Sequence, residues 1–217
     1  MLTRQFSDEF DALIKIKGYT YELDEYEKSI LLTEAQESLV VGLYNGTVKG
    51  VSFEETEELR KYLSELICED TFSLDSSTDD SYIFTTKDSI LFTIYEKVNL
   101  EKGVYCEGKT EMSVVPMRYD EWNRVKNNPF RGPNDRRAIR LDLGDNKVEI
   151  VSRHPVVSYY LRYLKKPNPI ILVDLPDGLE IDDFNTNTEC ELNTALHRYI
   201  LRTAVQLALE KYAKQSS

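Results

Sequence analysis

The sequence is poor in the residues that build disulfide frameworks and metal sites. Its 217 residues include three cysteines, Cys68, Cys106 and Cys190, and two histidines, His154 and His197. The cysteines are odd in number and show no CxxC spacing, so we expect reduced thiols rather than disulfides or a zinc site. Cys190 and His197 have no second ligand pair beside them, which also argues against zinc. The sequence therefore predicts no metal and no cofactor.

Nucleotide-binding and hydrolase motifs are also missing. There is no GxxxxGK[ST], no GxGxxG and no GxSxG. The acidic run Asp174–Asp183 lacks the spacing of a calcium loop, and it lacks the lysine that a metal-dependent nuclease places beside its acids. We interpret this run as a solvated turn and His197 as a structural residue rather than a general base. No catalytic residue is predicted.

The sequence also lacks long apolar runs and a positive net charge. No run approaches the roughly 18 apolar residues of a membrane helix, so no membrane contact is expected. The segment Met1–Glu9 turns acidic where a signal peptide would be apolar, so we expect synthesis in a cytoplasm without secretion. The net charge is −11, with 27 basic and 38 acidic residues, and such a surface repels a polyanion. This balance argues against a protein that wraps nucleic acid.

Residues 1–70 have a helical pattern. A first element ends at Gly18. Thr33–Gln36 has the form of a capping box before an apolar stripe that stops at Asn45–Gly46. Ser52–Glu55 repeats the capping signature before a second stripe, and glutamates crowd its first turns. Together these signals predict an N-terminal helical hairpin.

From Tyr82 to Leu175 the apolar pattern changes to a period of two, which predicts β-strands. Glu69–Asp80 is polar and is expected to be a linker. Gly144–Asn146 suggests a tight hairpin turn, and residues 120–125 suggest one helical turn. The predicted strands are 82–84, 90–95, 104–106, 112–115, 139–143, 148–151, 156–164 and 170–173.

The C-terminal stretch is helical again, with Asn193 as its cap and an apolar stripe through Leu196, Ile200 and Leu207. The predicted class is α+β: an N-terminal helical hairpin, a central antiparallel β-sheet or small sandwich, and a C-terminal amphipathic helix. The expected division is a helical region at 1–70 and a β-rich region with the C-terminal helix at 71–217. One compact domain is the alternative.

The segment Pro116–Arg140 differs from the rest of the chain. It contains Trp122, the one tryptophan, and seven basic residues of an otherwise acidic protein. Within it, Asn128–Pro133 is a stiff loop because two prolines fix their φ angles. Its Phe130 and Arg131 are of types enriched where proteins bind each other. The alternative is a loop packed on its own sheet, with Arg131 paired to an acid, and the residue types favour neither.

This segment also resembles a pattern in virion structural proteins of crAss-like phages of gut Bacteroidota, the neck/tail ring (head-to-tail connector) family. Asn193 departs from the pattern, which has proline there, but asparagine also caps a helix. The matching segments, which span nearly the whole chain, are Leu32–Gln36, Phe53–Lys61, Tyr119–Arg124, Asn128–Pro133, Val157–Leu172 and Cys190–Val205.

The resemblance implies a non-enzymatic subunit of a homo-oligomeric ring, commonly of twelve copies, between the portal and the tail, through which DNA passes. It implies the portal and neighbouring ring proteins as partners and the virion as location. A closed ring joins two different patches of each subunit. We expect a basic patch with an aromatic anchor and an acidic patch on the Glu-rich helix. The candidate interface residues are Trp122, Arg124, Pro129, Phe130, Arg131, Arg136, Arg137, Glu54, Glu55 and Glu58.

Two other classes stay open at this stage. One is a different virion component, such as a head-completion or tail tube protein. The other is a small phage enzyme that processes nucleic acid.

For a ring around DNA, the negative net charge would have a function, because carboxylates lining the channel would repel the phosphates of the DNA.

Overall fold

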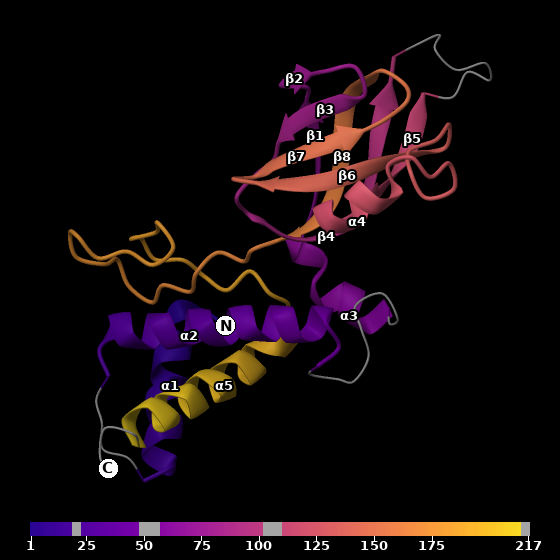
Figure 1. The fold of residues 1–217 in the computed structure, drawn as a ribbon. Coiled ribbons are helices and arrows are strands. Elements are labelled where there is room, and N and C mark those ends of the chain that lie inside the picture. The colour runs from indigo at the N-terminus through magenta and orange to yellow at the C-terminus, as the bar shows by residue number, and fades with distance from the viewer. Residues whose placement is uncertain (19–22, 48–56, 102–109, 214–217) are drawn as a thin grey trace. The chain divides into compact units, whose positions relative to one another are not determined.

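The computed structural model describes residues 1–18, 23–47, 57–101 and 110–213, without the side chains of residues 212 and 213. It contains two compact units, which are described separately: Met1–Leu66 with Lys166–Ser217, and Ile67–Lys165 (Figure 1). The first unit is helical and the second is built on one sheet. The predicted α+β class is confirmed. No helix in the described part of the chain is long and apolar enough to cross a membrane.

The helical unit contains three main helices, α1, α2 and α5, whose apolar faces share a core. Phe6 and Phe10 of α1, Leu32 of α2, and Ile200 and Ala204 of α5 are all fully buried. The C-terminal helix therefore packs with the N-terminal helices, whereas the expected division grouped it with the strands. The element bounds are α1 Thr3–Ile16, α2 Glu25–Tyr44, α3 Glu57–Tyr62, a 3₁₀ turn η1 at Ser64–Leu66, and α5 Thr194–Ala213.

The beginning of α2 differs from the prediction. Its N-cap is Asp24, whose carboxylate accepts a hydrogen bond from the Glu27 backbone N–H at 2.7 Å. The predicted cap at Thr33 is wrong, because Thr33 lies inside α2. Its Oγ1 instead accepts a hydrogen bond from the backbone N–H of Ile170 at 3.0 Å. A threonine whose hydroxyl bonds a distant backbone group can have the same neighbours in the sequence as a threonine that caps a helix.

The other helix boundaries agree in part with the prediction. Gly18, with φ +84°, follows α1, and Asn193 caps α5 by accepting a bond from the Ala195 N–H at 3.0 Å. The second helix of the predicted hairpin is short in the described chain: α3 ends at Tyr62, and Ile67 already begins a strand. The capping signature at 52–55 lies outside the described residues.

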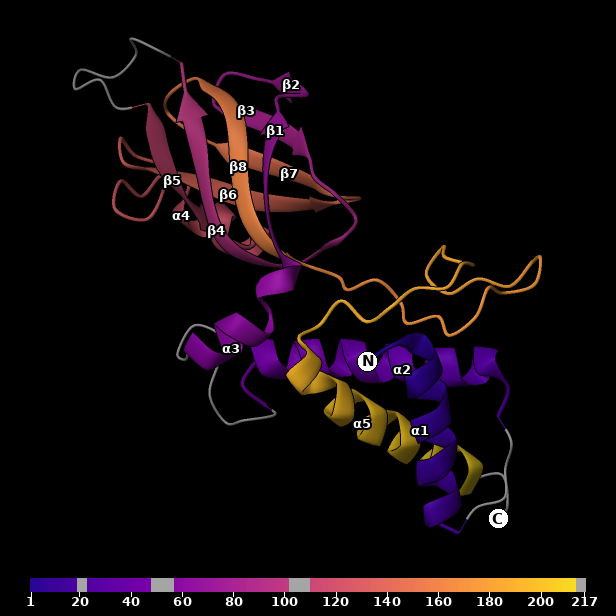
Figure 2. The ribbon, with the colours of Figure 1, turned by 180° about the vertical axis from the view of Figure 1, so that it is seen from behind.

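The second unit is an eight-stranded sheet in the order β1-β8-β4-β5-β6-β7-β3-β2 (Figures 1 and 2). Every neighbouring pair is antiparallel except β5 and β6, which are parallel. A parallel pair needs a crossover connection, and this one carries α4, Tyr119–Val125. The strands are β1 Ile67–Ser73, β2 Ser76–Ser77, β3 Ser81–Thr85, β4 Ile90–Leu100, β5 Glu111–Pro116, β6 Arg137–Gly144, β7 Lys147–Val151 and β8 Val156–Lys165.

Three local predictions in and around the sheet have different outcomes. The linker expected at residues 69–80 is wrong, because this segment contributes β1 and β2. The strand at 170–173 is also wrong: only an isolated bridge pairs Ile171 with Thr188. The hairpin turn at Gly144–Asn146 is confirmed, and all three of its residues have positive φ. The strand predicted at 104–106, with Cys106, lies outside the described residues.

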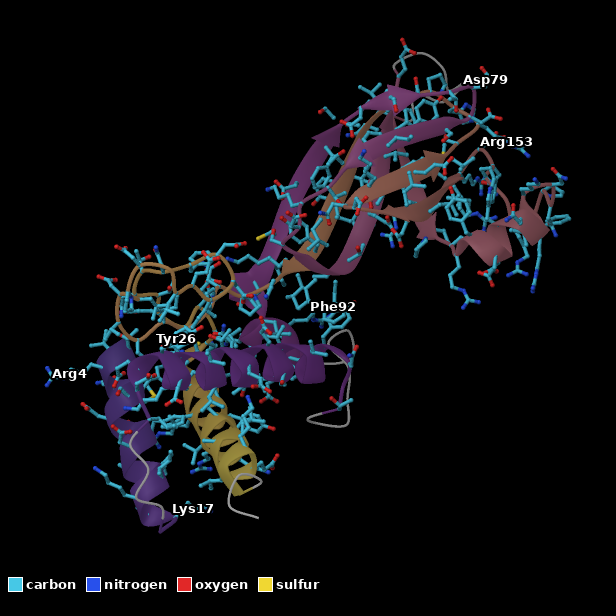
Figure 3. All side chains as sticks on the ribbon, turned by 60° about the vertical axis from the view of Figure 1, so that its left-hand side comes forward. Arg4, Lys17, Tyr26, Asp79, Phe92 and Arg153 are labelled. Atoms are coloured by element: carbon cyan, nitrogen blue, oxygen red, sulfur yellow. The ribbon has the colours of Figure 1, made fainter. Side chains whose placement is uncertain are left out.

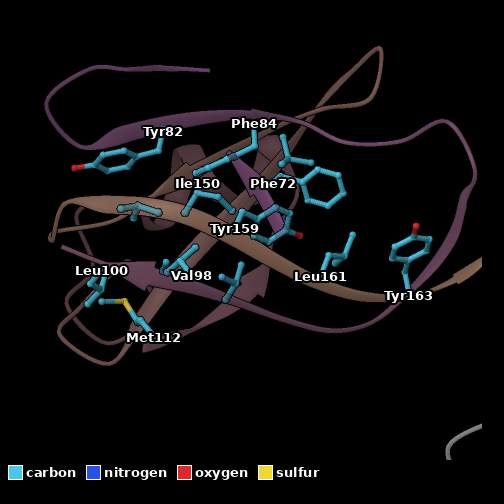
Figure 4. Close-up of a cluster of buried hydrophobic side chains, with 14 residues drawn as sticks. Phe72, Tyr82, Phe84, Val98, Leu100, Met112, Ile150, Tyr159, Leu161 and Tyr163 are labelled. Atoms are coloured by element: carbon cyan, nitrogen blue, oxygen red, sulfur yellow. The ribbon is translucent and has the colours of Figure 1, made fainter. Parts of the chain in front are cut away.

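The sheet is curled, so its inner face encloses a core (Figure 4). Tyr159 of β8 and Phe84 of β3 are fully buried, and their ring centroids lie 5.7 Å apart. A second cluster lies beside β6 and β7, where Ile139, Leu141 and Val151 are covered by Met117 and Trp122. This second cluster fixes the position of α4 and of the loop that follows it.

Candidate subunit interface

The β5–β6 crossover is attached to the sheet at its beginning and through α4. The Met117 N–H donates to the Arg140 carbonyl at 2.9 Å, which continues the β5–β6 pairing by one bond. Trp122 is half-buried against the second cluster, and Val125, at the end of α4, is buried. Trp122 therefore serves mainly to anchor α4 on its own unit.

The loop after α4 closes on itself through Asn128. Its side chain accepts a bond from the Phe130 N–H at 2.9 Å, and its carbonyl accepts from the Gly132 N–H at 2.8 Å. A Cβ on Gly132 would lie 3.0 Å from the Asn128 carbonyl oxygen and 3.3 Å from that of Lys126. The close backbone approach explains why a residue without a side chain stands between Arg131 and Pro133.

Two arginines hold this loop in place. Arg137, on β6, donates from Nη2 to the Phe130 carbonyl at 2.6 Å and to the Gly132 carbonyl at 2.9 Å. Arg131 forms an ion pair with Glu121 of α4. These contacts belong to the loop's own structure, as in the alternative interpretation of a loop packed on its sheet.

The remaining candidates on the loop point into solvent. The Phe130 side chain is 84% exposed, which is the highest value among the exposed large apolar residues of the described chain. Pro129, Arg124 and Arg136 are exposed as well. Among the described residues, neither Arg124 nor Arg136 has a side-chain partner. The loop is therefore held on its own unit, while one aromatic ring and two guanidinium groups point into solvent. We call residues 124–137 the basic loop.

The acidic candidates lie on the helical unit. Glu54 and Glu55 are outside the described residues. Glu58 lies in the first turn of α3, is exposed, and accepts a bond from the Tyr62 hydroxyl at 2.7 Å. The basic loop belongs to the sheet unit, so the two predicted patches are on different units of the chain.

A buried polar cluster that no sequence motif indicates lies near the same crossover. Glu96 of β4 is 7% exposed and accepts bonds from the Tyr159 hydroxyl at 2.6 Å and from Arg140 Nη1 at 3.1 Å. Burial raises the pKa of the Glu96 carboxyl, and the neighbouring Arg140 opposes that shift. Burial also raises the pKa of Tyr159 far above its ordinary value. Arg140 Nη1 also donates to the Thr93 hydroxyl at 3.3 Å, so the cluster links β6 to β4 and β8.

His197 lies in the helical unit, where its Nδ1 is 2.5 Å from the Met1 amino nitrogen. It is buried, its Nε2 lies 2.8 Å from the Leu192 carbonyl oxygen, and its ring packs on Phe6. Burial lowers its pKa. Within the described residues, no three His, Cys, Asp or Glu side chains are grouped so as to hold a metal ion.

The fold and the candidate site define a class: an α+β protein of two compact units whose most distinctive surface feature is an exposed loop that carries an aromatic ring. The whole chain, residues 1–217, matches the phage tail ring protein 3/4 family, and the protein belongs to that family. It is 43% identical to "Ring protein 3" of Bacteroides phage crAss001, over 96% of this chain and 95% of that protein. It is 29% identical to "Ring protein 4/5" of the same phage, over 98% and 94% of the two chains.

The resemblance to crAss-like phage ring proteins is therefore confirmed. The chain is a phage structural ring protein and a component of the virion.

Proposed function

We propose that this chain is a non-enzymatic subunit of a closed homo-oligomeric ring of twelve copies, placed in the neck or tail between the portal and the tail. The genome passes through the ring without being processed. The observation that carries the proposal is the match of the complete chain to a family of ring proteins, with the two ring-protein relatives aligned over nearly their full lengths.

The proposed contacts of the ring begin with the basic loop. It carries five basic residues against one acidic residue, Asp135, in a chain whose net charge is −11. An exposed aromatic ring surrounded by guanidinium groups is a typical anchor at protein interfaces. Because a closed ring is built by a heterologous contact, the loop would meet a different, acidic patch on its neighbour. Glu54, Glu55 and Glu58 are the proposed acidic patch, and the portal or an adjacent ring is the other proposed partner.

The proposed role of the excess acid is to line the channel. Carboxylates along the wall repel the phosphates of DNA and prevent it from sticking during passage. A ring whose channel wall is basic would contradict this part of the proposal.

Electron microscopy of the purified protein tests the proposal. We expect closed rings of the wild-type chain, and loss of rings in the variant Phe130→Ala/Arg136→Ala. The unfolding free energy should stay within about 0.5 kcal/mol of wild type, because both side chains are exposed. The matched control is Val157→Ala/Arg153→Ala, an exposed apolar residue and an exposed arginine of the same unit, which should leave rings intact. Normal rings in the Phe130 variant would remove the basic loop from the interface.

A further inference from the structure

The long connection between β8 and α5 runs along α2 and forms an acidic arm, defined here as residues 173–187 (Figures 1 and 3). It contains five carboxylates and no lysine or arginine. A bond from the Leu175 N–H to the Asn185 carbonyl at 2.7 Å holds its two sides together, and Ile181 pairs with Phe184 near its tip. The acidic side chains of this run are exposed, as expected for a solvated turn, and these backbone pairings also give it a defined shape.

The arm is fixed on α2 at its base and, through Lys166, also near its tip. The backbone N–H of Leu172 donates to the Ser29 hydroxyl at 3.0 Å, in the same way that Ile170 donates to Thr33. Lys166 pairs with Asp182 and with Glu37 of α2, both at 2.9 Å. An element attached this firmly presents its tip in a defined orientation.

The tip also carries two carboxylates that have no partner within the described chain. Asp177 and Glu180 are exposed and make no hydrogen bond or ion pair. Leu179 and Phe184 are 39% and 37% exposed. The tip therefore offers carboxylates and apolar side chains together, which is a composition suited to a groove with an apolar floor and a cationic rim.

The helical unit contains such a groove between α1 and α5. Two adjoining hollows, of about 340 and about 250 Å³, share Leu13 and Arg202 in their linings. Leu201, Val205 and Leu209 of α5 complete the apolar floor. We call this feature the α1/α5 groove.

The rim of the α1/α5 groove is mainly cationic. Lys17 follows the C-terminal end of α1, where Figure 3 labels it, and Arg198 and Arg202 lie one turn apart on α5. All three are exposed and have no side-chain partner in the described structure. Glu9 is the one acidic residue in the lining. Three cations around an apolar floor match the carboxylates and apolar side chains of the arm tip.

The arm of one copy does not face its own groove. In both opposite views the arm runs along one side of α2, while α5 and the C-terminal part of α1, which line the groove, lie on the other side (Figures 1 and 2). The ion pairs of Lys166 hold the arm on that side. A second copy is therefore the source of an acidic arm that can enter the groove.

We propose that the acidic arm of one copy docks in the α1/α5 groove of the next copy. Asp177 and Glu180 pair with Arg198 and Arg202, and Leu179 inserts over the apolar floor. Because the two surfaces differ and lie on opposite faces of the unit, the contact is heterologous and passes from copy to copy in one direction. This inference rests on the proposed function in that it requires copies to assemble, but it assigns the contact to surfaces other than the basic loop.

A charge-swap experiment tests the contact. The arm variant is Asp177→Lys/Glu180→Lys, and the groove variant is Arg198→Glu/Arg202→Glu. Each alone places like charges together and should weaken self-association about 100-fold, as measured by sedimentation velocity. The two sets combined in one chain, or an equal mixture of the two variants, restore opposite charges at the contact and should recover most of the association. The matched control, Arg60→Glu/Lys61→Glu, reverses two exposed cations of α3 and should leave association unchanged.

A photo-crosslinking residue at position 179 gives an independent readout. We expect cross-links between copies, to the peptides of α1 and α5. Cross-links to the basic loop, or within one chain, would overturn the proposal, as would failure of the combined variant to recover. If wild type and every variant form the same rings, the arm contact is wrong and the ring proposal stands. If the swap behaves as expected but only open chains of copies form, the arm contact stands and the closed ring is wrong. A wild-type protein that does not associate at all would refute both.

Discussion

Replacing Arg140 by methionine is the sharpest test of how the sheet unit is held together. The side chains of Arg140 and Glu96 are 13% and 6% exposed and lie 3.1 Å apart. Removing one partner of a buried pair leaves an uncompensated charge and costs roughly 3–5 kcal/mol. Since Glu96 keeps its bond to the Tyr159 hydroxyl, we expect a loss of unfolding free energy at the lower end, about 3 kcal/mol at pH 7.5.

The loss should depend on pH in a defined direction. Burial already raises the pKa of Glu96 in the folded protein, and without Arg140 it rises further. The folded state then binds more protons than the unfolded state in the window above the ordinary glutamate pKa, so stability falls as pH rises through that window. Between pH 7.5 and pH 5.0, the deficit of Arg140→Met should therefore shrink by roughly 1 kcal/mol or more, because one pKa unit corresponds to about 1.4 kcal/mol.

Urea unfolding followed by tryptophan fluorescence measures this effect on the correct unit, because Trp122 is the one tryptophan and lies in the sheet unit. Two control variants are measured in the same way. Arg162→Met breaks an exposed pair with Glu69 and should cost less than about 1 kcal/mol. Glu96→Leu/Arg140→Met removes both charges and should recover most of the loss. A deficit below about 1 kcal/mol for Arg140→Met, or one independent of pH, would refute the reasoning.

Two further substitutions test local packing. Gly132→Ala places a Cβ 3.0 Å from the Asn128 carbonyl oxygen, so the loop backbone must shift at a cost of roughly 1–3 kcal/mol; fluorescence-detected unfolding would contradict this if the change were under about 0.5 kcal/mol. Thr33→Val removes the acceptor of the buried Ile170 N–H and should cost roughly 1–3 kcal/mol, measured by far-UV circular dichroism. The exposed Thr194→Val is its control, and an equal effect of the two changes would show that the hydroxyl of Thr33 is not needed.

Much of the fold could be predicted from local patterns. Alternating apolar residues located most of the strands, and the positive-φ turn at Gly144–Asn146 was visible in its residue types. The cap of α5 at Asn193 was visible as well. These features depend on neighbours in the sequence, so the sequence carries them directly.

The features that sequence reasoning missed depend on distant partners. The hydroxyl of Thr33 bonds a residue 137 positions away, so its local pattern imitates a helix cap. The polar residues 69–80 form strands because their partners lie in β8 and β3. The helix α5 packs on α1 and α2 because its apolar stripe fits their core, which no local pattern reveals.

The residue composition of the candidate interface could be predicted from the sequence, but the role of each of its residues could not. The residue types between Pro116 and Arg140 distinguish this segment from the rest of the chain, and its role as an interface stays a prediction. Only the coordinates separate Trp122, Arg131 and Arg137, which build the loop, from Phe130 and Arg136, which are free to contact another molecule. The acidic arm could not be distinguished from a solvated turn, because its shape depends on backbone pairing and on its attachment to α2.

Cryo-electron microscopy of the assembled virion tests ring membership most directly. We expect copies of the helical unit and of the eight-stranded sheet unit to repeat around the tail axis in one closed ring between the portal and the tail, with an acidic channel wall. A virion in which this chain occupies the capsid shell, or surrounds no channel, would contradict the proposed function.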